Sequence, residues 1–236
     1  MKSRIEKIRA YAKAMIGRLI VADQKLAMLK PLFFEKELIE KWNNSYGAHG
    51  LESLRMTLYF DLVRELAAVS LDSDPRSPSI HNILQLLESK PLLDALKDEY
   101  CEPLPINWIN DVDEGSKKFW EEKHREREIA ENLDRFGEHH SKAKDEFKEI
   151  KNSELFKKIK DTRNKIVAHY EMRAGGEPPR LFAPTDIGLK WSDAEEYLEA
   201  IKPIMIELVL LISNEAYALD IYREQHEKVA ADFWSK

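Results

Sequence analysis

The sequence predicts an all-α protein, a helical bundle, and three observations carry that prediction. Apolar residues recur at spacings of three and four along most of the chain, as on the buried face of a helix. Hydrophobic residues make up 43% and charged residues 34% of the 236 residues, and only eight residues are glycine. That composition is typical of a charge-rich helical protein. We therefore treat residues 1–236 as a single helical domain.

Clusters of proline, glycine and polar residues separate the expected helices. Three helices also contain a residue that favours a kink or a break, namely Pro31, Gly137 and Pro203. The last helix is apolar on more than one face over Ile204 to Ile212, so we expect it at the centre of the bundle or against a second subunit. In chain order, the helices are expected at residues 2–44, 51–71, 80–89, 91–100, 116–150, 153–172 and 192–233.

Two longer connections stand out. Two prolines between Cys101 and Asp113 predict a loop around Trp108. After residue 172, two glycines and three prolines indicate that the chain leaves the helix, and Arg180–Phe182 is a candidate to pair with Ile187–Leu189 as a small hairpin. The sequence Ser-x-x-Glu beginning at Ser192 then has the form of a capping box for the last helix.

The segment from Ser116 to Ile150 differs from the rest, because about every third residue is charged and apolar residues are sparse. This pattern predicts a helix with a narrow buried stripe. Together with the preceding loop, it makes residues 101–150 a candidate protruding charged helical insertion that could bind a partner.

We expect neither a metal nor a cofactor. Glu121 and His124 have the Glu-x-x-His spacing of di-iron bundles, but such a site needs a second copy, which the sequence lacks. His139 and His140 are adjacent, yet further ligands at a suitable spacing are missing. A metal-dependent bundle enzyme is therefore not favoured.

Charge and cysteine content narrow the classes of function. The formal net charge of −6 argues against wholesale wrapping of nucleic acid, so an RNA-acting protein would need a local basic site. The single cysteine, Cys101, excludes an intrachain disulfide and predicts a cytoplasmic protein. We expect no signal peptide and no membrane segment, because the longest apolar run is short and contains Glu207.

The candidate functional residues lie in the segment from Asp161 to Tyr170. If residues 153–172 form one α-helix, its apolar side chains fill an arc of roughly 120°, and Arg163 falls inside that arc with His169 at its edge. An arginine on an apolar face needs a carboxylate, a set of carbonyls or a bound anion. The alternative is that Arg163 reaches a neighbouring acid, and that His169 is a core or last-turn histidine that complements the helix dipole.

Arg163, Asn164 and His169, read as R-N-x-x-x-A-H, resemble the signature of the HEPN superfamily, in which an arginine precedes a histidine by a short spacer. The order of helices around the motif resembles the abortive-infection (AbiU-like) branch. The resemblance implies a HEPN-like helical bundle with a small loop or hairpin after the motif helix. It also implies a homodimer with a composite site, and a toxin–antitoxin or phage-defence role with an antitoxin or regulatory protein as partner.

The motif suits metal-independent cleavage of RNA by an endoribonuclease. His169 could move a proton at the 2′-hydroxyl or at the leaving 5′-oxygen. Arg163 could hold the scissile phosphate, and Asn164 could orient the histidine or the sugar. Positive charge also concentrates around the motif, and three further residues are candidate RNA contacts: Lys160, Lys165 and Arg173.

A second class of function stays open. In it the chain is a non-catalytic helical interaction or regulatory module of a defence or toxin–antitoxin system, and Arg163 is a structural charge at an interface. One departure from the family also matters. Members paired with a nucleotidyltransferase antitoxin carry a tyrosine two residues after the histidine, whereas here Glu171 holds that place and Tyr170 follows His169 directly. The resemblance therefore does not extend to control by adenylylation of that tyrosine.

Overall fold

The structure is a computed structural model that describes residues 1–43, 45–103, 113–169, 171–173 and 180–235. Within these residues every regular element is a helix, apart from one isolated antiparallel bridge between Met172 and Leu181, so the predicted all-α class is confirmed. The elements in chain order are α1 (Lys2–Phe34), α2 (Lys36–Trp42), α3 (Gly47–Leu71), α4 (Ile80–Leu87), α5 (Lys90–Tyr100), α6 (Glu114–Lys151), α7 (Glu154–Thr162), the π-helix η1 (Arg163–Ala168), α8 (Pro184–Ile187), α9 (Asp193–Ser213) and α10 (Leu219–Trp234).

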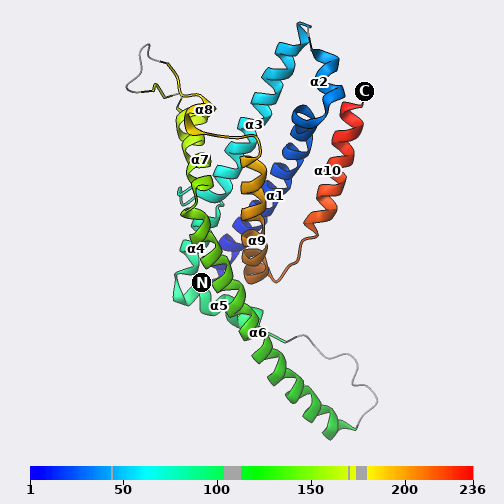
Figure 1. Cartoon of the computed structure of the whole chain (residues 1–236). Coiled ribbons are helices and arrows are strands. Elements are labelled where there is room, and N and C mark those ends of the chain that lie inside the picture. Colours follow the sequence, from blue (N-terminus) through cyan, green and yellow to red (C-terminus); the bar gives the residue numbers. More distant parts are fainter. Residues whose placement is uncertain (44, 104–112, 170, 174–179, 236) are drawn as a thin grey trace.

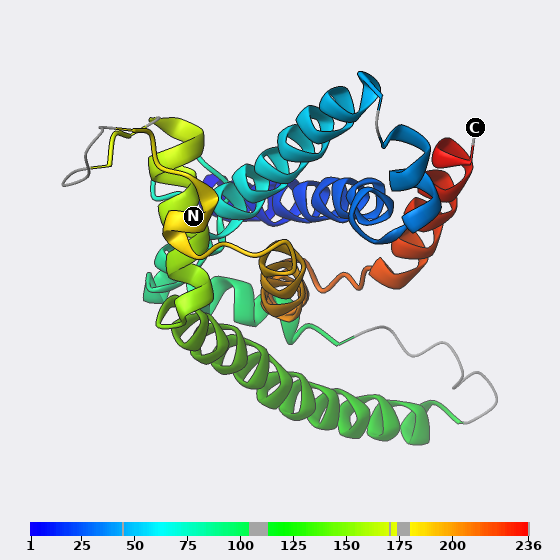
Figure 2. The same cartoon turned by 45° about the horizontal axis from the view of Figure 1, so that its top comes forward.

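Helix α9 lies at the centre of the bundle, between α6 on one side and α1 with α3 on the other (Figures 1 and 2). It contributes a continuous line of side chains to the hydrophobic core, because the apolar residues of this helix occur on more than one face. Tyr197, Ile201, Ile204, Leu208 and Leu211 are each at most 1% exposed. The expectation of a central last helix therefore holds for α9.

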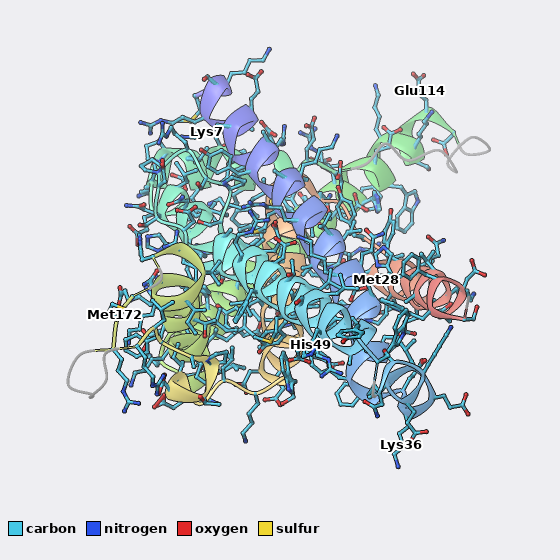
Figure 3. The ribbon with its side chains drawn as sticks, turned by 90° about the horizontal axis from the view of Figure 1, so that it is seen from above. Lys7, Met28, Lys36, His49, Glu114 and Met172 are labelled. Carbon is cyan, nitrogen blue, oxygen red and sulfur yellow. The ribbon has the colours of Figure 1, made fainter. Side chains whose placement is uncertain are left out.

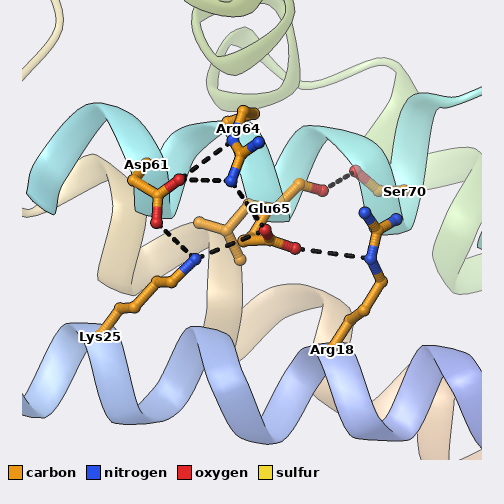
Figure 4. A network of polar contacts seen from close by, with 7 residues as sticks. Arg18, Lys25, Asp61, Arg64, Glu65 and Ser70 are labelled. Atoms are coloured by element: carbon orange, nitrogen blue, oxygen red, sulfur yellow. Dashed lines mark hydrogen bonds and ion pairs between the residues drawn. The ribbon is translucent and has the colours of Figure 1, made fainter. Parts of the chain in front are cut away.

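Helices α1 and α3 are joined by a network of ion pairs at the edge of the core (Figure 4). Lys25 Nζ lies 2.5 Å from Asp61 Oδ2 and 3.4 Å from Glu65 Oε1. Arg18 Nε approaches the second oxygen of Glu65 at 3.5 Å, and Arg64 Nη2 lies 2.5 Å from Asp61 Oδ1. Lys25 and Glu65 are 20% and 12% exposed, so their pairing fixes how the two helices lie against each other more than a surface pair would. Arg64 is 57% exposed and pairs within α3.

The expected helix over residues 2–44 is divided, but four residues after Pro31, and the break expected at Gly137 does not occur. Helix α1 continues through Pro31 to Phe34, because the proline lies in the last turn. The chain turns at Glu35, which is extended (φ −87°, ψ 102°) and whose amide donates to the Pro31 carbonyl at 3.1 Å. Gly137 does not interrupt α6, since the adjacent Phe136 is buried against the bundle and holds the helix in register.

The expected helix over residues 192–233 is in fact two helices. Pro203 lies within α9, which ends at Ser213. Asn214 has left-handed backbone (φ 51°), a conformation that asparagine tolerates at a helix end, and α10 then returns along α1. Ser192 does not form the expected capping box, because its backbone is already helical and its side chain makes no cap hydrogen bond.

Helix α6 packs on the bundle through its C-terminal part, where Phe136, Ala143 and Phe147 are buried. Its N-terminal part extends beyond the other helices (Figures 1 and 2). We call residues 114–135 the arm; its Phe119 and Trp120 are 52% and 53% exposed and form an edge-to-face pair. The expected loop around Trp108, which precedes the arm, lies mostly outside the described residues.

A buried carboxylate fastens α6 to α9 just beyond the arm. Glu207 of α9 accepts hydrogen bonds from His139 Nδ1 and from Lys142 Nζ, the latter at 2.5 Å. Burial alone would raise the pKa of Glu207, but the hydrogen bonds from Lys142 and His139 outweigh it, so the pKa lies below its ordinary value. Glu207 is therefore ionised at neutral pH and binds His139 and Lys142 on one side of α6.

Among the described helices, none combines the length and the apolar character that crossing a bilayer would require.

Candidate functional site

The motif segment begins with a well-defined helix start. The Ser153 hydroxyl accepts a hydrogen bond from the Phe156 amide at 3.1 Å, and Glu154 follows in the first turn, where a negative charge complements the helix dipole. Ile159 and Thr162 are fully buried, and α7 packs on α3 and α9. This packing fixes the position and direction of α7, and therefore of the motif residues that continue from its end.

The α-helix expected to run to residue 172 ends at Thr162 and continues as a π-helix over Arg163–Ala168. A π-helix has i→i+5 hydrogen bonds and is frequent at functional sites. It stops at His169, whose backbone (φ −125°, ψ −11°) is no longer helical. Because the helix changes its pitch within the motif, a count at 100° per residue does not apply to the residues after Arg163.

Arg163 is exposed, so the prediction that it faces the apolar interior is wrong. The buried side of the segment is the line Ile159–Thr162–Ile166, and Arg163 lies beside that line rather than on it. Packing selects Thr162 for the inner position, since a small side chain is far less costly to bury than a guanidinium. His169 is exposed as well.

The polar contacts of the motif join two of its three residues. Arg163 Nη1 donates to Asn164 Oδ1 at 2.9 Å, so Asn164 orients the arginine rather than the histidine. Within the described part of the chain, Arg163 has no carboxylate partner, and the His169 ring makes no hydrogen bond or ion pair. The structure therefore brings Arg163 and Asn164 together and leaves His169 free at the end of the same short helix.

Most of the positive charge predicted around the motif is already paired. Lys165 Nζ lies 3.2 Å from Asp161 Oδ2 and 5.1 Å from the centre of the Phe182 ring. Arg173 Nη1 lies 2.8 Å from Asp186 Oδ1. Of the three candidate RNA contacts, Lys160 is the one with no acidic partner among the described residues, and it is exposed one turn before Arg163.

The chain after the motif folds back differently from the expected hairpin. Arg180–Phe182 runs antiparallel to Glu171–Arg173, with the Arg173 amide donating to the Arg180 carbonyl at 2.8 Å and the Phe182 amide to the Glu171 carbonyl at 3.0 Å. Ile187 cannot take part, because Pro184 starts the helical turn α8. Residues 174–179, which connect the two paired stretches, lie outside the described residues, as does Tyr170. Met172 marks this edge of the molecule in Figure 3.

Asp186 holds this returning segment in place, a role that was not predicted from the sequence. Its carboxylate accepts from Arg173, from Arg180 Nη1 at 2.6 Å and from the Ala183 amide at 2.9 Å. The Arg180 guanidinium and the Ala183 amide hold the pKa of Asp186 well below its usual range. The sequence does contain a signal for this position, because Pro184 followed two residues later by Asp186 is a common pattern at a helix start.

In the described residues, no group of three or more histidine, cysteine, aspartate or glutamate side chains is arranged to hold a metal. His124 Nε2 lies 3.2 Å from Glu128 rather than meeting Glu121, and His139 is bound to Glu207. His124 and His139 thus have other partners.

An all-α bundle with an Arg-Asn…His motif at the end of a packed helix has the features that the resemblance to the HEPN superfamily implies. A comparison with models of protein families matches residues 5–233 to the HEPN family described as AbiU2, and the chain belongs to that family. The predicted abortive-infection branch is confirmed. Searches of curated proteins and of solved structures gave no match.

Proposed function

We propose that the protein is a metal-independent endoribonuclease of the cytoplasm, acting as a HEPN toxin or anti-phage effector, with Arg163, Asn164 and His169 as its catalytic residues. One observation carries the proposal. The Arg163 guanidinium at the start of η1 and the His169 ring directly after its end are both exposed, and neither is neutralised by a carboxylate among the described residues. An unpaired guanidinium can bind phosphate, and an imidazole can donate or accept a proton.

The chemistry follows from these groups. His169 takes the proton from a 2′-hydroxyl, or gives one to the leaving 5′-oxygen. The 2′-oxygen then bonds to phosphorus as the P–O5′ bond breaks, which leaves a 2′,3′-cyclic phosphate and a 5′-hydroxyl. Arg163 stabilises the charge on the phosphate oxygens, and its bond to Asn164 uses one of its five N–H groups, leaving others for bidentate contact. DNA lacks the attacking group and stays intact.

We also propose that the active form is a homodimer. A single histidine cannot act as acid and base in one concerted step, whereas two motifs facing across a two-fold axis supply both groups. The exposure of Arg163 and His169 supports this arrangement, because a second subunit can reach residues that lie at the surface.

The direct test is cleavage of single-stranded and structured RNA in excess EDTA. Arg163→Ala and His169→Ala should each lower the rate by about 10²- to 10³-fold. Lys157→Ala on α7 and His49→Ala on α3 remove the same kinds of side chain at exposed positions and should cleave like the wild type. Figure 3 shows His49 well apart from Met172 and the motif edge. Equal cleavage by all four variants would reveal a contaminant and refute the proposal.

The dimer has its own test, which mixes the wild type with His169→Ala. If one active site needs the histidines of both subunits, a mixed dimer is inactive. Random exchange between equal amounts leaves about a quarter of the dimers fully wild type, so activity should fall to about a quarter of that of the same total amount of wild type. Activity of about one half, with exchange verified by mass spectrometry, would show that each subunit acts alone and refute the shared site.

A non-catalytic interaction module is the second candidate, and the exposed Phe119 and Trp120 on the arm favour it. Growth of a bacterial host separates the two. Expression of the endoribonuclease should arrest growth, and His169→Ala should relieve the arrest. An interaction module would act in the same way with either residue at position 169.

A further inference from the structure

A concave surface separate from the motif lies between α4 and the C-terminal part of α6, which run on the same side of the bundle (Figures 1 and 2). It encloses about 510 Å³, and none of the motif residues lines it. Its floor is apolar and is made by Leu84, Leu87 and Phe147. A volume of this size is typical of sites for small molecules rather than for single ions.

The α6 wall of this pocket is basic. His140, Lys144, Lys148 and Lys151 follow one another at spacings of four, four and three, so they share one face of the helix. Among the described residues, none of the three lysines is paired with a carboxylate; Lys151 Nζ lies 5.9 Å from the centre of the Phe147 ring. Like charges at these spacings destabilise a helix slightly, and the cost would be offset by an anion bound between them.

The α4 wall adds polar groups but little negative charge. His81, Gln85 and Glu88 line it, and Glu88 is the one carboxylate among the residues that form the pocket. Burial and the nearby Lys144 lower the pKa of His140, so that its ring is neutral at pH 7 and able to donate or accept a hydrogen bond. In a chain of net charge −6, the pocket is thus a local cationic site.

We propose that this pocket binds a small organic phosphate of mononucleotide size, with the phosphate between the α6 lysines and a planar apolar group against the floor. The three unpaired lysines suit a dianion, since charge-assisted hydrogen bonds to phosphate are the strong ones. The apolar floor and the volume leave room beyond the phosphate for a body the size of a base or another aromatic ring.

The test measures binding by titration calorimetry, without RNA and at constant ionic strength, with adenosine 5′-monophosphate as the probe. Inorganic phosphate and adenosine supply its two parts. We expect saturable binding of the monophosphate, at least tenfold tighter than that of either part. Lys144→Gln/Lys148→Gln should weaken it about tenfold or more, whereas Lys118→Gln/Lys123→Gln, the same charge change on the arm, should leave it unchanged.

Three results would overturn the proposal: no saturable binding, equal binding of inorganic phosphate and the monophosphate, or equal loss in both double variants. All four lysines are exposed, so the variants should fold, and thermal unfolding verifies this. Arg163→Ala should bind the probe like the wild type. The outcome therefore does not depend on whether the motif cleaves RNA.

Discussion

Glu207→Gln tests the contact that holds α6 on α9. The wild-type carboxylate is 11% exposed and accepts from His139 and from Lys142. Glutamine keeps the size of the side chain but removes its charge, so the ion pair with Lys142 is lost, and its NH₂ group takes the place of one of the two acceptor oxygens that bind His139 and Lys142. We expect the free energy of unfolding to fall by about 1–2 kcal/mol, because Lys142, which is 53% exposed, recovers part of its hydration.

Urea unfolding at pH 7 measures this change, and for a chain of this size it corresponds to a fall in Tm of roughly 2–8 °C. Glu196→Gln, at an exposed position on the same helix, is the control and should stay within about 0.5 kcal/mol of the wild type.

The difference in unfolding free energy between the wild type and Glu207→Gln should also decrease as the pH is lowered. The pKa of Glu207 is lower in the folded than in the unfolded protein, so its contribution is fully present above the ordinary value of 4.5. It is lost as the pH falls through the lowered folded pKa. The gap between wild type and Glu207→Gln should therefore close in acid. A gap that stays constant down to pH 3, or a variant as stable as the wild type at pH 7, would refute this account.

Further predictions concern the motif surroundings and the core. Asp186→Ala should release the two arginines that it binds and strengthen the affinity for single-stranded RNA, measured by fluorescence anisotropy in a His169→Ala background. Tyr197→Phe should cost about 0.5–1.5 kcal/mol of unfolding free energy, since its hydroxyl donates to buried Ser70 Oγ at 2.7 Å. Gly188→Ala should cost about 1 kcal/mol in the same urea assay, because Gly188 has φ +68°.

The helices could be predicted from the sequence because apolar periodicity and packing agree over most of their length. Their ends were harder, since a break depends on what the neighbouring residues contact. Pro31 is accommodated in the last turn of α1, and the real reversal after α9 occurs at Asn214, which no proline or glycine marks. Local propensity is weak compared with tertiary packing at such positions.

The motif could be recognised in the sequence, but its geometry could not be predicted from the sequence. A helical wheel placed Arg163 inside, whereas the burial of Thr162 leaves it outside, and the switch to a π-helix changes the positions of the residues that follow it. The roles of the Asp186 and Glu207 carboxylates could not be predicted either, because ion pairs between separate elements produce no periodic pattern in the sequence.

The pairing of charges limits how strongly one motif can attract RNA. Lys165 and Arg173 are occupied by carboxylates, and Lys160 and Arg163 are the two cations of the candidate site without such a partner among the described residues. Two phosphate contacts predict that the logarithm of the RNA affinity falls with the logarithm of salt concentration with a slope of about −1.4 per subunit. A dimer doubles this slope. Filter binding of His169→Ala between low and moderate salt measures it, and a slope several times steeper would mean that cations far from Arg163 hold the strand.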